Sequence, residues 1–396
     1  MSRVETVGTA TLAGFALRTL ERESGTEHYL TSTATAPSDA TVEAAGAHFA
    51  RVAATLAEGG VQVIQEKVYG SSQAREDVLA IRARELERCG LDPSPAVTYV
   101  ECRPACGGEL AGVQVWGVAP RERGRRVVET VAADGAPPGR RWSGPGFRLL
   151  YMPDFGGRAP DGTLSPTVTE QAQQMFTTAG EALKAHGLSY PQVVRTWIYL
   201  PRILDWYGEF NRVRNLHYAA EGLDGDTPGA VFPASTGIQG GGRGRECFMD
   251  VLALERERDR DGTVRVEPLR RSARQDKACD YGSAFSRGMS LEIEGRQTIF
   301  VSGTASINSA GDTVHCGNRE AQCLETLLSI AALLEERGSG LRDISSATLF
   351  CKDVEVYRAF ESVTRLLGVP PFPKVAVLAD VCRPDLLVEI EAVALA

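Results

Sequence analysis

The chain has 396 residues, of which 43% are hydrophobic, and it carries a formal net charge of −8. This length exceeds that of one small core, so we expect two or three modules. The acidic balance and the lack of long Lys/Arg runs argue against nucleic-acid binding, and no apolar stretch of about 18 residues is present to span a membrane.

The first predicted unit has the order helix, strand, helix, strand. The segment "AAGAHFARVAATLAEGGVQVIQEKVYGSSQAREDVLAIRAR" alternates between helical and strand periodicity, and "AGVQVWGVA" (111–119) closes the unit as a strand. The copy is fainter than the two that follow, so the unit is recognised by this order of elements alone.

The second and third units repeat this order more clearly. Residues 170–214 and 320–365 each predict an amphipathic helix, a strand (195–200 or 347–351) and a second helix. An alternating strand closes each unit, "ECFMDVLALE" in the second and "LLVEIEAVALA" in the third. Three units of similar size therefore account for the chain.

Two polar segments separate the units. Residues 119–146 are rich in Arg, Gly and Pro, and residues 255–277 are highly charged. Both are typical of exposed connections, with room for an edge strand in each. The expected modules therefore span 1–120, 145–256 and 278–396.

The predicted fold class is α+β, with three tandem modules packed as a pseudo-trimer. Two helices can cover only one face of each sheet, so the other face must be buried elsewhere. Three such faces in one chain can pack together around a pseudo-threefold axis. The chain is therefore expected to act as a monomer.

The nine cysteines do not form a recognisable framework. Their odd number and scattered positions favour reduced thiols and a cytoplasmic location, and the N-terminal segment lacks a signal peptide's apolar core. Cys102 and Cys106 are the closest pair, but no second pair or nearby histidine completes a zinc set. No metal site is expected.

The closing strand carries two carboxylates within an apolar run. Glu389 and Glu391 share one face, since residues i and i+2 of a strand point the same way. Burial raises the pKa of an unpaired carboxyl and makes it a usable general acid near neutral pH.

The repeats provide an internal control for these two residues. Aligning the units places Phe248 and Gln114 at the position of Glu389, whereas Asp250 and Trp116 correspond to Glu391. Only one of three equivalent strands therefore carries an acid at the Glu389 position. A salt-bridged structural role for Glu389 remains the alternative, and Glu391 is expected to be structural.

Several motifs resemble a known superfamily. The third unit carries "VSGTASI", "TVHCGN" and "CRPDLLVEIEAVA", which are similar to the YjgF/RidA superfamily. The second unit carries "YGEFNRVR" and "FPASTGIQGGG", and "YGSAFSRG" follows it. Together these motifs resemble the chorismatase branch, in which the units are fused in one chain. The resemblance covers residues 145–396.

The resemblance implies a catalytic acid and two product-setting positions. The glutamate matching Glu389 is the general acid of chorismatases. Two positions separate the product types of that family, and here they are Gly303 and Cys382. This combination resembles the branch that makes 3-hydroxybenzoate from chorismate rather than a cyclohexadiene diol. Buried inert packing for Cys382 and simple turn chemistry for Gly303 remain alternatives.

A substrate with two carboxylates calls for fixed cations, and arginine binds carboxylates bidentately. Arg195, Arg214 and Arg383 are the candidates, with surface ion pairing as the alternative for each. Tyr281 and Arg287 of "YGSAFSRG" are expected to line the same pocket. No cofactor is implied, and the expected partner is a small carboxylate.

Two alternative functions remain open. The deaminases of the superfamily use an arginine fifteen positions before the glutamate and often a cysteine two residues after it; here Lys374 and Ala376 occupy these positions. Lysine lacks the planar fork of arginine, which weakens an enamine/imine hydrolase. A non-catalytic metabolite-binding role is the other alternative, and His315 is either a pocket-lining group or a turn residue.

Overall fold

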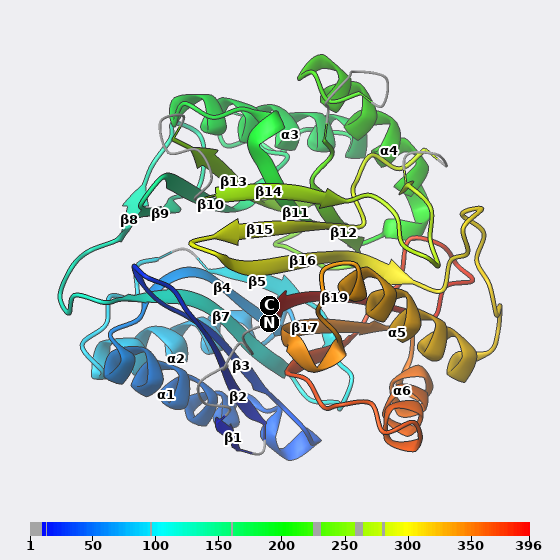
Figure 1. Ribbon diagram of the computed structural model, residues 1–396, viewed down its shortest axis with the longest axis horizontal. Coiled ribbons are helices and arrows are strands. Elements are labelled where there is room, and N and C mark those ends of the chain that lie inside the picture. The colour runs from blue at the N-terminus through cyan, green and yellow to red at the C-terminus, as the bar shows by residue number, and fades with distance from the viewer. Residues whose placement is uncertain are drawn as a thin grey trace.

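The computed structural model describes residues 10–12, 14–95, 97–159, 161–224, 231–257, 264–278 and 282–396. Three mixed sheets and three pairs of α-helices make up the molecule. The sheets face the centre and the helix pairs lie at the periphery, one pair behind each sheet (Figure 1). The predicted α+β pseudo-trimer is therefore confirmed.

The first sheet has the strand order β1-β2-β3-β7-β4-β5. Its strands are β1 (Ala10–Leu12), β2 (Phe15–Glu21), β3 (Gly25–Thr33), β4 (Gln62–Gly70), β5 (Thr98–Glu101) and β7 (Leu110–Pro120). Its helices are α1 (Val42–Gly59) and α2 (Arg75–Arg88). Thr41 caps α1 through its side chain, and Gly60 ends the helix in the left-handed conformation that glycine adopts without strain.

The second sheet has the order β12-β11-β13-β10-β9-β8. Its strands are β8 (Val128–Val131), β9 (Gly139–Gly144), β10 (Phe147–Gly156), β11 (Val193–Tyr199), β12 (Ala234–Ile238) and β13 (Phe248–Arg256). Its helices are α3 (Val168–Ala185) and α4 (Ile203–Ala220). A capping box between Thr167 and Glu170 begins α3.

The third sheet has the order β14-β15-β16-β19-β17-β18-β6. Its strands are β6 (Arg103–Pro104), β14 (Val264–Leu269), β15 (Gly288–Ile293), β16 (Arg296–Ala305), β17 (Ile344–Cys351), β18 (Lys374–Leu378) and β19 (Val388–Leu395). Its helices are α5 (Arg319–Glu335) and α6 (Val354–Leu366), capped by Asn318 and Asp353. Strand β6 comes from the first part of the chain, so the sheets also interlock at an edge.

The core consists of a central cluster and three peripheral ones. The central cluster takes residues from all three sheets, among them Trp116, Trp197 and Phe300. Each peripheral cluster lies between one sheet and its own helix pair. Each sheet thus buries both faces, as its two-sided apolar strands require.

The closing strand follows the predicted alternation. Val388, Ile390 and Ala392 pack in the peripheral cluster beneath α5 and α6, while Val393 and Leu395 contact the central cluster. The two glutamates therefore lie on the face turned toward the other sheets. Within the described ranges, no helix has the length and apolar character needed to cross a membrane.

Candidate active site

A cavity of about 180 Å³ lies between the second and third sheets. One wall comes from α4 and β12, and the other from β16, β19 and the loop before β19. Fourteen residues line it: Tyr207, Asn211, Arg214, Ser235, Gly237, Ser283, Phe285, Arg287, Gly303, Ala305, Ile307, Cys382, Arg383 and Glu389. Five predicted site residues, together with Arg287, thus meet in one place.

Hydrogen bonds from backbone amides to side-chain hydroxyls fix the two walls relative to each other. The amide of Ser235 donates to Oγ of Ser302 at 2.9 Å, and the amide of Gly303 donates to Oγ1 of Thr236 at 3.1 Å. Both bonds cross from one sheet to the other. The cavity walls are therefore held by short, direct contacts between β12 and β16.

Glu389 lies in β19, opposite Ala305 of β16 and Phe350 of β17. Its side chain lines the cavity although the residue is only 5% exposed. Burial, assisted by the neighbouring charge of Glu391, raises the pKa of the Glu389 carboxyl from 4.5 to about 8, and Arg195 opposes this rise. Glu389 is therefore mostly protonated near pH 7 and can donate a proton.

Gly303 lies in a β-bulge of β16, where the register with β19 shifts between Val301 and Thr304. A Cβ at position 303 would overlap Oε1 of Glu389 and would lie 3.2 Å from Cγ2 of Thr236. Any other residue would thus displace the carboxyl or the neighbouring strand. β-Bulges often occur beside active sites because they re-aim a strand's side chains.

Helix α4 supplies the cationic wall. Tyr207, Asn211 and Arg214 follow one another at helical spacing and all line the cavity. Arg214 is only 1% exposed, yet its Nε and Nη2 have no hydrogen-bond partner, and Oδ1 of Asn211 also has none. Buried unpaired groups are costly, so a ligand carboxylate and a donor such as a hydroxyl would satisfy them.

Cys382 and Arg383 lie beside Glu389 in the loop before β19. Burial raises the pKa of the Cys382 thiol to about 12, with a smaller contribution from Glu389. The thiol is therefore uncharged at neutral pH and is no thiolate nucleophile. Nη1 of Arg383 donates to the carbonyl of Gly311 at 2.7 Å, which fixes the guanidinium at the cavity wall.

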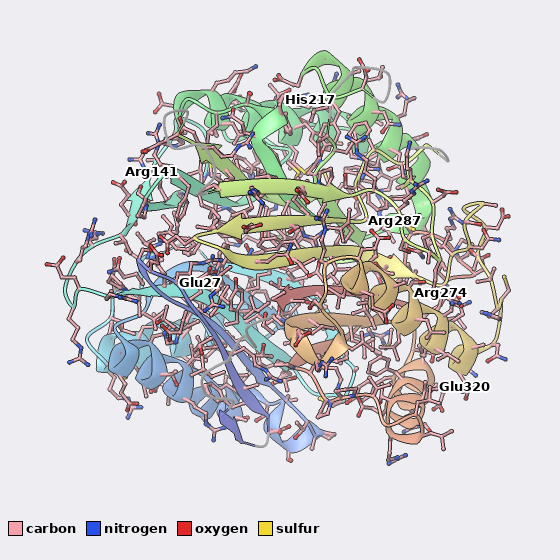
Figure 2. All side chains as sticks on the ribbon, in the orientation of Figure 1. Glu27, Arg141, His217, Arg274, Arg287 and Glu320 are labelled. Carbon is pink, nitrogen blue, oxygen red and sulfur yellow. The ribbon has the colours of Figure 1, made fainter. Side chains whose placement is uncertain are left out.

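Arg287 precedes β15 and forms part of the same site. Its Nε donates to the carbonyl of Asp276 at 3.0 Å, and its guanidinium lies 5.6 Å from the ring centre of Phe285. The residue lies in the region between α4 and α5 (Figure 2). Three arginines, from α4, the 282–287 segment and the loop before β19, thus surround the cavity.

Two predicted site residues are not found in this lining. Arg195 is 2% exposed and lies in β11, where its Nη2 donates to Oε2 of Glu391 at 2.8 Å. It lines a smaller central cavity of about 40 Å³ instead, because its strand faces the pseudo-threefold axis. Tyr281 lies outside the described residues.

The residues on which the alternative functions depended lie elsewhere. Lys374 forms an ion pair with Glu361 at 3.1 Å and is absent from the lining of the cavity. His315 has a half-exposed side chain 3.9 Å from Glu325 and occupies a left-handed turn position. His315 is thus a turn residue.

Sequence reasoning did not single out Tyr207, Asn211, Ser235 or Phe285. Tyr207 lies two helical turns and Asn211 one turn before Arg214 on the same face, so the helical period would have identified them once Arg214 was chosen. Ser235 and Phe285 come from loops and strand ends, for which no such period exists. Across the described residues, no group of three or more His, Cys, Asp and Glu side chains is arranged to hold a metal.

Comparison with known proteins agrees with this architecture. Residues 283–396 match the family described as Endoribonuclease L-PSP. A 3-hydroxybenzoate synthase of Streptomyces hygroscopicus is 29% identical over 257 residues, which cover 59% of this chain and 72% of that protein. The 3-aminoacrylate deaminase RutC of Acinetobacter baylyi is 30% identical over 97 residues, or 24% of this chain and 77% of that one.

A solved chorismatase structure shares the fold across most of the chain. It superimposes with a TM-score of 0.54 and 20% identity, covering 84% of this chain and 92% of that one. The match extends over the divergent first part of the chain as well as the two clearer units. The chain thus belongs to the Endoribonuclease L-PSP family, the YjgF/RidA superfamily, and within it is similar to the chorismatases.

Proposed function

We propose that this protein removes pyruvate from chorismate and forms 3-hydroxybenzoate, with Glu389 as the general acid. The observation that carries the proposal is a buried carboxyl, protonated near neutral pH, in a cavity walled by three arginines. The similarity to a 3-hydroxybenzoate synthase over 257 residues supports the choice of substrate and product.

The cationic groups match the two carboxylates of chorismate. Arg214 offers two unpaired nitrogens within the cavity, and Arg287 and Arg383 lie on the opposite wall. Two separated cationic groups bind a dicarboxylate in one orientation, because each carboxylate then has its own partner. Asn211 offers an acceptor for the ring hydroxyl.

The first chemical step is proton transfer from Glu389 to the methylene carbon of the enol ether. A C–H bond forms, the adjacent carbon becomes an oxocarbenium ion, and Glu389 becomes a carboxylate. General acid catalysis of this kind contributes about 10² to 10⁴ in rate. Burial keeps Glu389 protonated before the step, because an unpaired carboxylate is destabilised there. After the step, the positive charge of the substrate lies beside the new carboxylate and offsets this destabilisation.

Pyruvate then leaves as the ring becomes aromatic. The ring's own hydroxyl attacks the neighbouring ring carbon, the bond from that carbon to the ether oxygen breaks, and its electron pair passes to pyruvate. The hydroxyl proton returns to Glu389, and the ring now carries an epoxide. The bond from the epoxide oxygen to the carbon that first held the hydroxyl then breaks, the other epoxide carbon loses its C–H proton, and the oxygen takes up a proton to give the phenol. Chorismate and the two products contain the same atoms, so no water is consumed.

Gly303 and Cys382 would favour this route over attack by water. Gly303 allows the Glu389 carboxyl to lie directly against the β16 bulge, and the neutral thiol of Cys382 fills space next to it. The cyclohexadiene diol is the product expected if water reached the oxocarbenium carbon instead. The product therefore reports which nucleophile the site admits.

An enamine or imine hydrolase is the alternative within the superfamily. It requires a cation at the position of Lys374 to hold the substrate carboxylate, and Lys374 is engaged by Glu361 outside the cavity. Incubation with chorismate distinguishes the two functions. We expect stoichiometric pyruvate in a coupled assay and 3-hydroxybenzoate by chromatography; absence of pyruvate at high enzyme concentration would contradict the proposal.

A further inference from the structure

The second glutamate of β19 lies in a buried ion pair next to the cavity. Both side chains of the Arg195–Glu391 pair are almost inaccessible, at 2% and 7% exposure. Nη2 of Arg195 donates to Oε2 of Glu391 at 2.8 Å, and the hydroxyl of Thr348 donates to Oε1 at 3.2 Å. Both oxygens of Glu391 are therefore engaged.

Arg195 also contacts Thr236, which lies next to the β16 bulge that faces Glu389. Its Nη2 donates to Oγ1 of Thr236, at 2.5 Å, and the same oxygen accepts the amide of Gly303 in the β16 bulge. Its Nη1 has no hydrogen-bond partner. One guanidinium nitrogen of Arg195 is therefore unpaired, and the charge of Arg195 acts on a second carboxyl, that of Glu389.

The structure contains only one of the two possible ion pairs. Among the described residues, Arg195 pairs with Glu391 and makes no salt bridge with Glu389, although the charge of Arg195 acts on Glu389. An arginine in contact with Glu389 would lower its pKa and favour its carboxylate form. The two glutamates thus compete for one cation, and Glu391 holds it.

We propose that Glu391 is a positioning residue that retains the Arg195 guanidinium in its own ion pair and so leaves Glu389 free to keep its proton. The catalytic meaning of this role rests on the proposed function, but the competition for Arg195 does not. Glu391 would not touch the substrate. It would set the protonation of the residue that does.

The charged groups around the pair are consistent with this role. Glu389 faces Cys382, Arg383 and Arg214 from the loop and α4, and Arg287 from the segment before β15. Glu391 faces the central cavity, whose other charged or titratable lining residues are Arg195, Lys67 and Tyr29. The charge of Glu391 also acts on the buried Tyr69 and Tyr199, and the charge of Asp250 acts on Lys67.

Lys67 does not substitute for Arg195. Its ammonium lies 3.9 Å from the ring centre of Trp197 and donates to the hydroxyl of Tyr199 at 3.1 Å. Burial lowers the pKa of Lys67 to about 8. Among the described residues, the only salt-bridge partner of Glu391 is Arg195, so loss of Glu391 would leave this guanidinium without an anion other than Glu389.

The test is the substitution Glu391→Gln, with two readouts of Glu389. The alkaline limb of kcat/KM should report loss of the Glu389 proton, near pH 8 in the unsubstituted protein. The second readout is direct carboxyl titration by infrared difference spectroscopy of each protein against its Glu389→Gln counterpart. Both midpoints should fall by at least about one pH unit in Glu391→Gln, because a charge that raised the pKa is lost and Arg195 is released.

Glu66→Gln is the matched control, since Glu66 of β4 and Arg82 of α2 form another buried ion pair at 2.6 Å, and neither residue lines the cavity. It should lower stability without moving either midpoint. The double variant Arg195→Met with Glu391→Gln leaves no unpaired buried charge, and it serves if the single variant does not fold. The midpoints of the double variant should lie within about one pH unit of those of the unsubstituted protein, because the opposite charges of Arg195 and Glu391 nearly cancel in their effect on Glu389.

Unmoved midpoints in Glu391→Gln would assign Glu391 to stability alone and overturn the inference. An upward shift of more than about one unit in the double variant would do the same, because it would mean that Arg195 already acts strongly on Glu389 despite the pair. If the unsubstituted protein releases no pyruvate, the proposed function fails, while the infrared titration still tests the competition for Arg195.

Discussion

At the scale of single residues, the proposed proton transfer depends on Glu389 and Gly303, which are neighbours in space but far apart in the sequence. Glu389 and Gly303 face each other across β19 and β16, and the missing Cβ of Gly303 makes room for the carboxyl. The resemblance that selected position 303 gave no physical reason for glycine. Close approach of a carboxyl gives that reason, and it differs from the left-handed turn geometry that usually requires glycine.

Gly303→Ala tests this close approach. The added methyl group would displace the Glu389 carboxyl or push against Thr236, so we expect kcat to fall by about two orders of magnitude or more, as is typical when a catalytic group is misplaced by about 1 Å. Steady-state kinetics with chorismate measures the effect. Gly208→Ala in α4 is the control, since its Cβ would meet open space; equal losses in both variants would contradict the argument.

At the residue level, the sequence was most informative where the repeats supplied a comparison. The alignment that set Glu389 against Phe248 is matched by the registers, because Phe350 pairs with Glu389 as Tyr199 pairs with Phe248. It did not show that Arg195 lines the central cavity, since a strand residue's identity does not tell which of two cavities its face will meet. That choice depends on how the three sheets pack.

At the scale of elements, helix α4 distinguishes the second unit from its repeats. Its Arg214 aligns with Thr364 of α6, and its Asn211 aligns with Glu361. In α6 the glutamate pairs with Lys374 of β18, so this helix presents a neutralised surface where α4 presents unpaired donors. The binding wall is therefore a property of α4 that its counterpart α6 does not share.

Arg214→Lys should weaken substrate binding more than it slows turnover. Lysine keeps the charge but loses the planar fork, so we expect KM to rise about 10-fold or more, equivalent to losing one charge-assisted hydrogen bond of about 1.5–3 kcal/mol. Steady-state kinetics at several chorismate concentrations separates KM from kcat. Arg212→Lys on the exposed side of the same helix is the control, and an unchanged KM in Arg214→Lys would remove Arg214 from the binding wall.

The sequence predicted the helices and closing strands better than the hairpins that begin each unit. Strands β8 and β9 lie within 119–146 and β14 lies within 255–277, where charge and Gly/Pro content suggested mainly exposed connections. Strands β8 and β14 lie at sheet edges and β9 lies next to an edge, and all three carry few apolar residues to mark them. Strand β6 is two residues long and is defined only by its partner β18, which no local pattern can indicate.

At the scale of the whole molecule, the three interfaces between the sheets are equivalent in position but differ in the residue that occupies the position of Glu389. Between the first and second sheets, Phe248 replaces the acid, and Arg245 lies 4.8 Å above its ring while pairing with Asp154. Between the third and first sheets, Gln114 replaces it and donates to the carbonyl of Ala347 at 2.7 Å. Near the centre, Glu27 (labelled in Figure 2) receives hydrogen bonds from Tyr29 and Trp116 and pairs with Arg22.

This asymmetry predicts one ligand site per chain. Calorimetric titration with 3-hydroxybenzoate should show one molecule bound per chain. Within the part of the chain that the structure describes, Phe248 and Gln114 stand in place of the acid at the other two interfaces, and Arg75 and Arg245 between the first and second sheets are paired with Glu101 and Asp154. The binding should weaken in Arg214→Lys. A second site of similar affinity would contradict the prediction and would direct attention to the larger cavity of about 510 Å³ near Glu101 and Lys352.

The division into three sheets follows from sequence because each unit must bury a second sheet face, and this requirement holds whatever the side chains are. The location of the site does not follow in the same way. It arises from α4 of one unit and β19 of the next, so it depends on the handedness of packing around the axis. Only the family resemblance supplied that information before the structure.

The most direct test of the account is pyruvate release from chorismate by the Glu389→Gln variant. We predict a loss of about 10²- to 10⁴-fold in kcat, because glutamine has no transferable proton. The variant should remain folded. The raised pKa of Glu389 makes the unsubstituted protein progressively less stable as pH rises from 4.5 to 8. The unfolding temperature of the Glu389→Gln variant at pH 8 should therefore equal or exceed that of the unsubstituted protein. A folded Glu389→Gln protein that still releases pyruvate at the original rate would contradict the central claim.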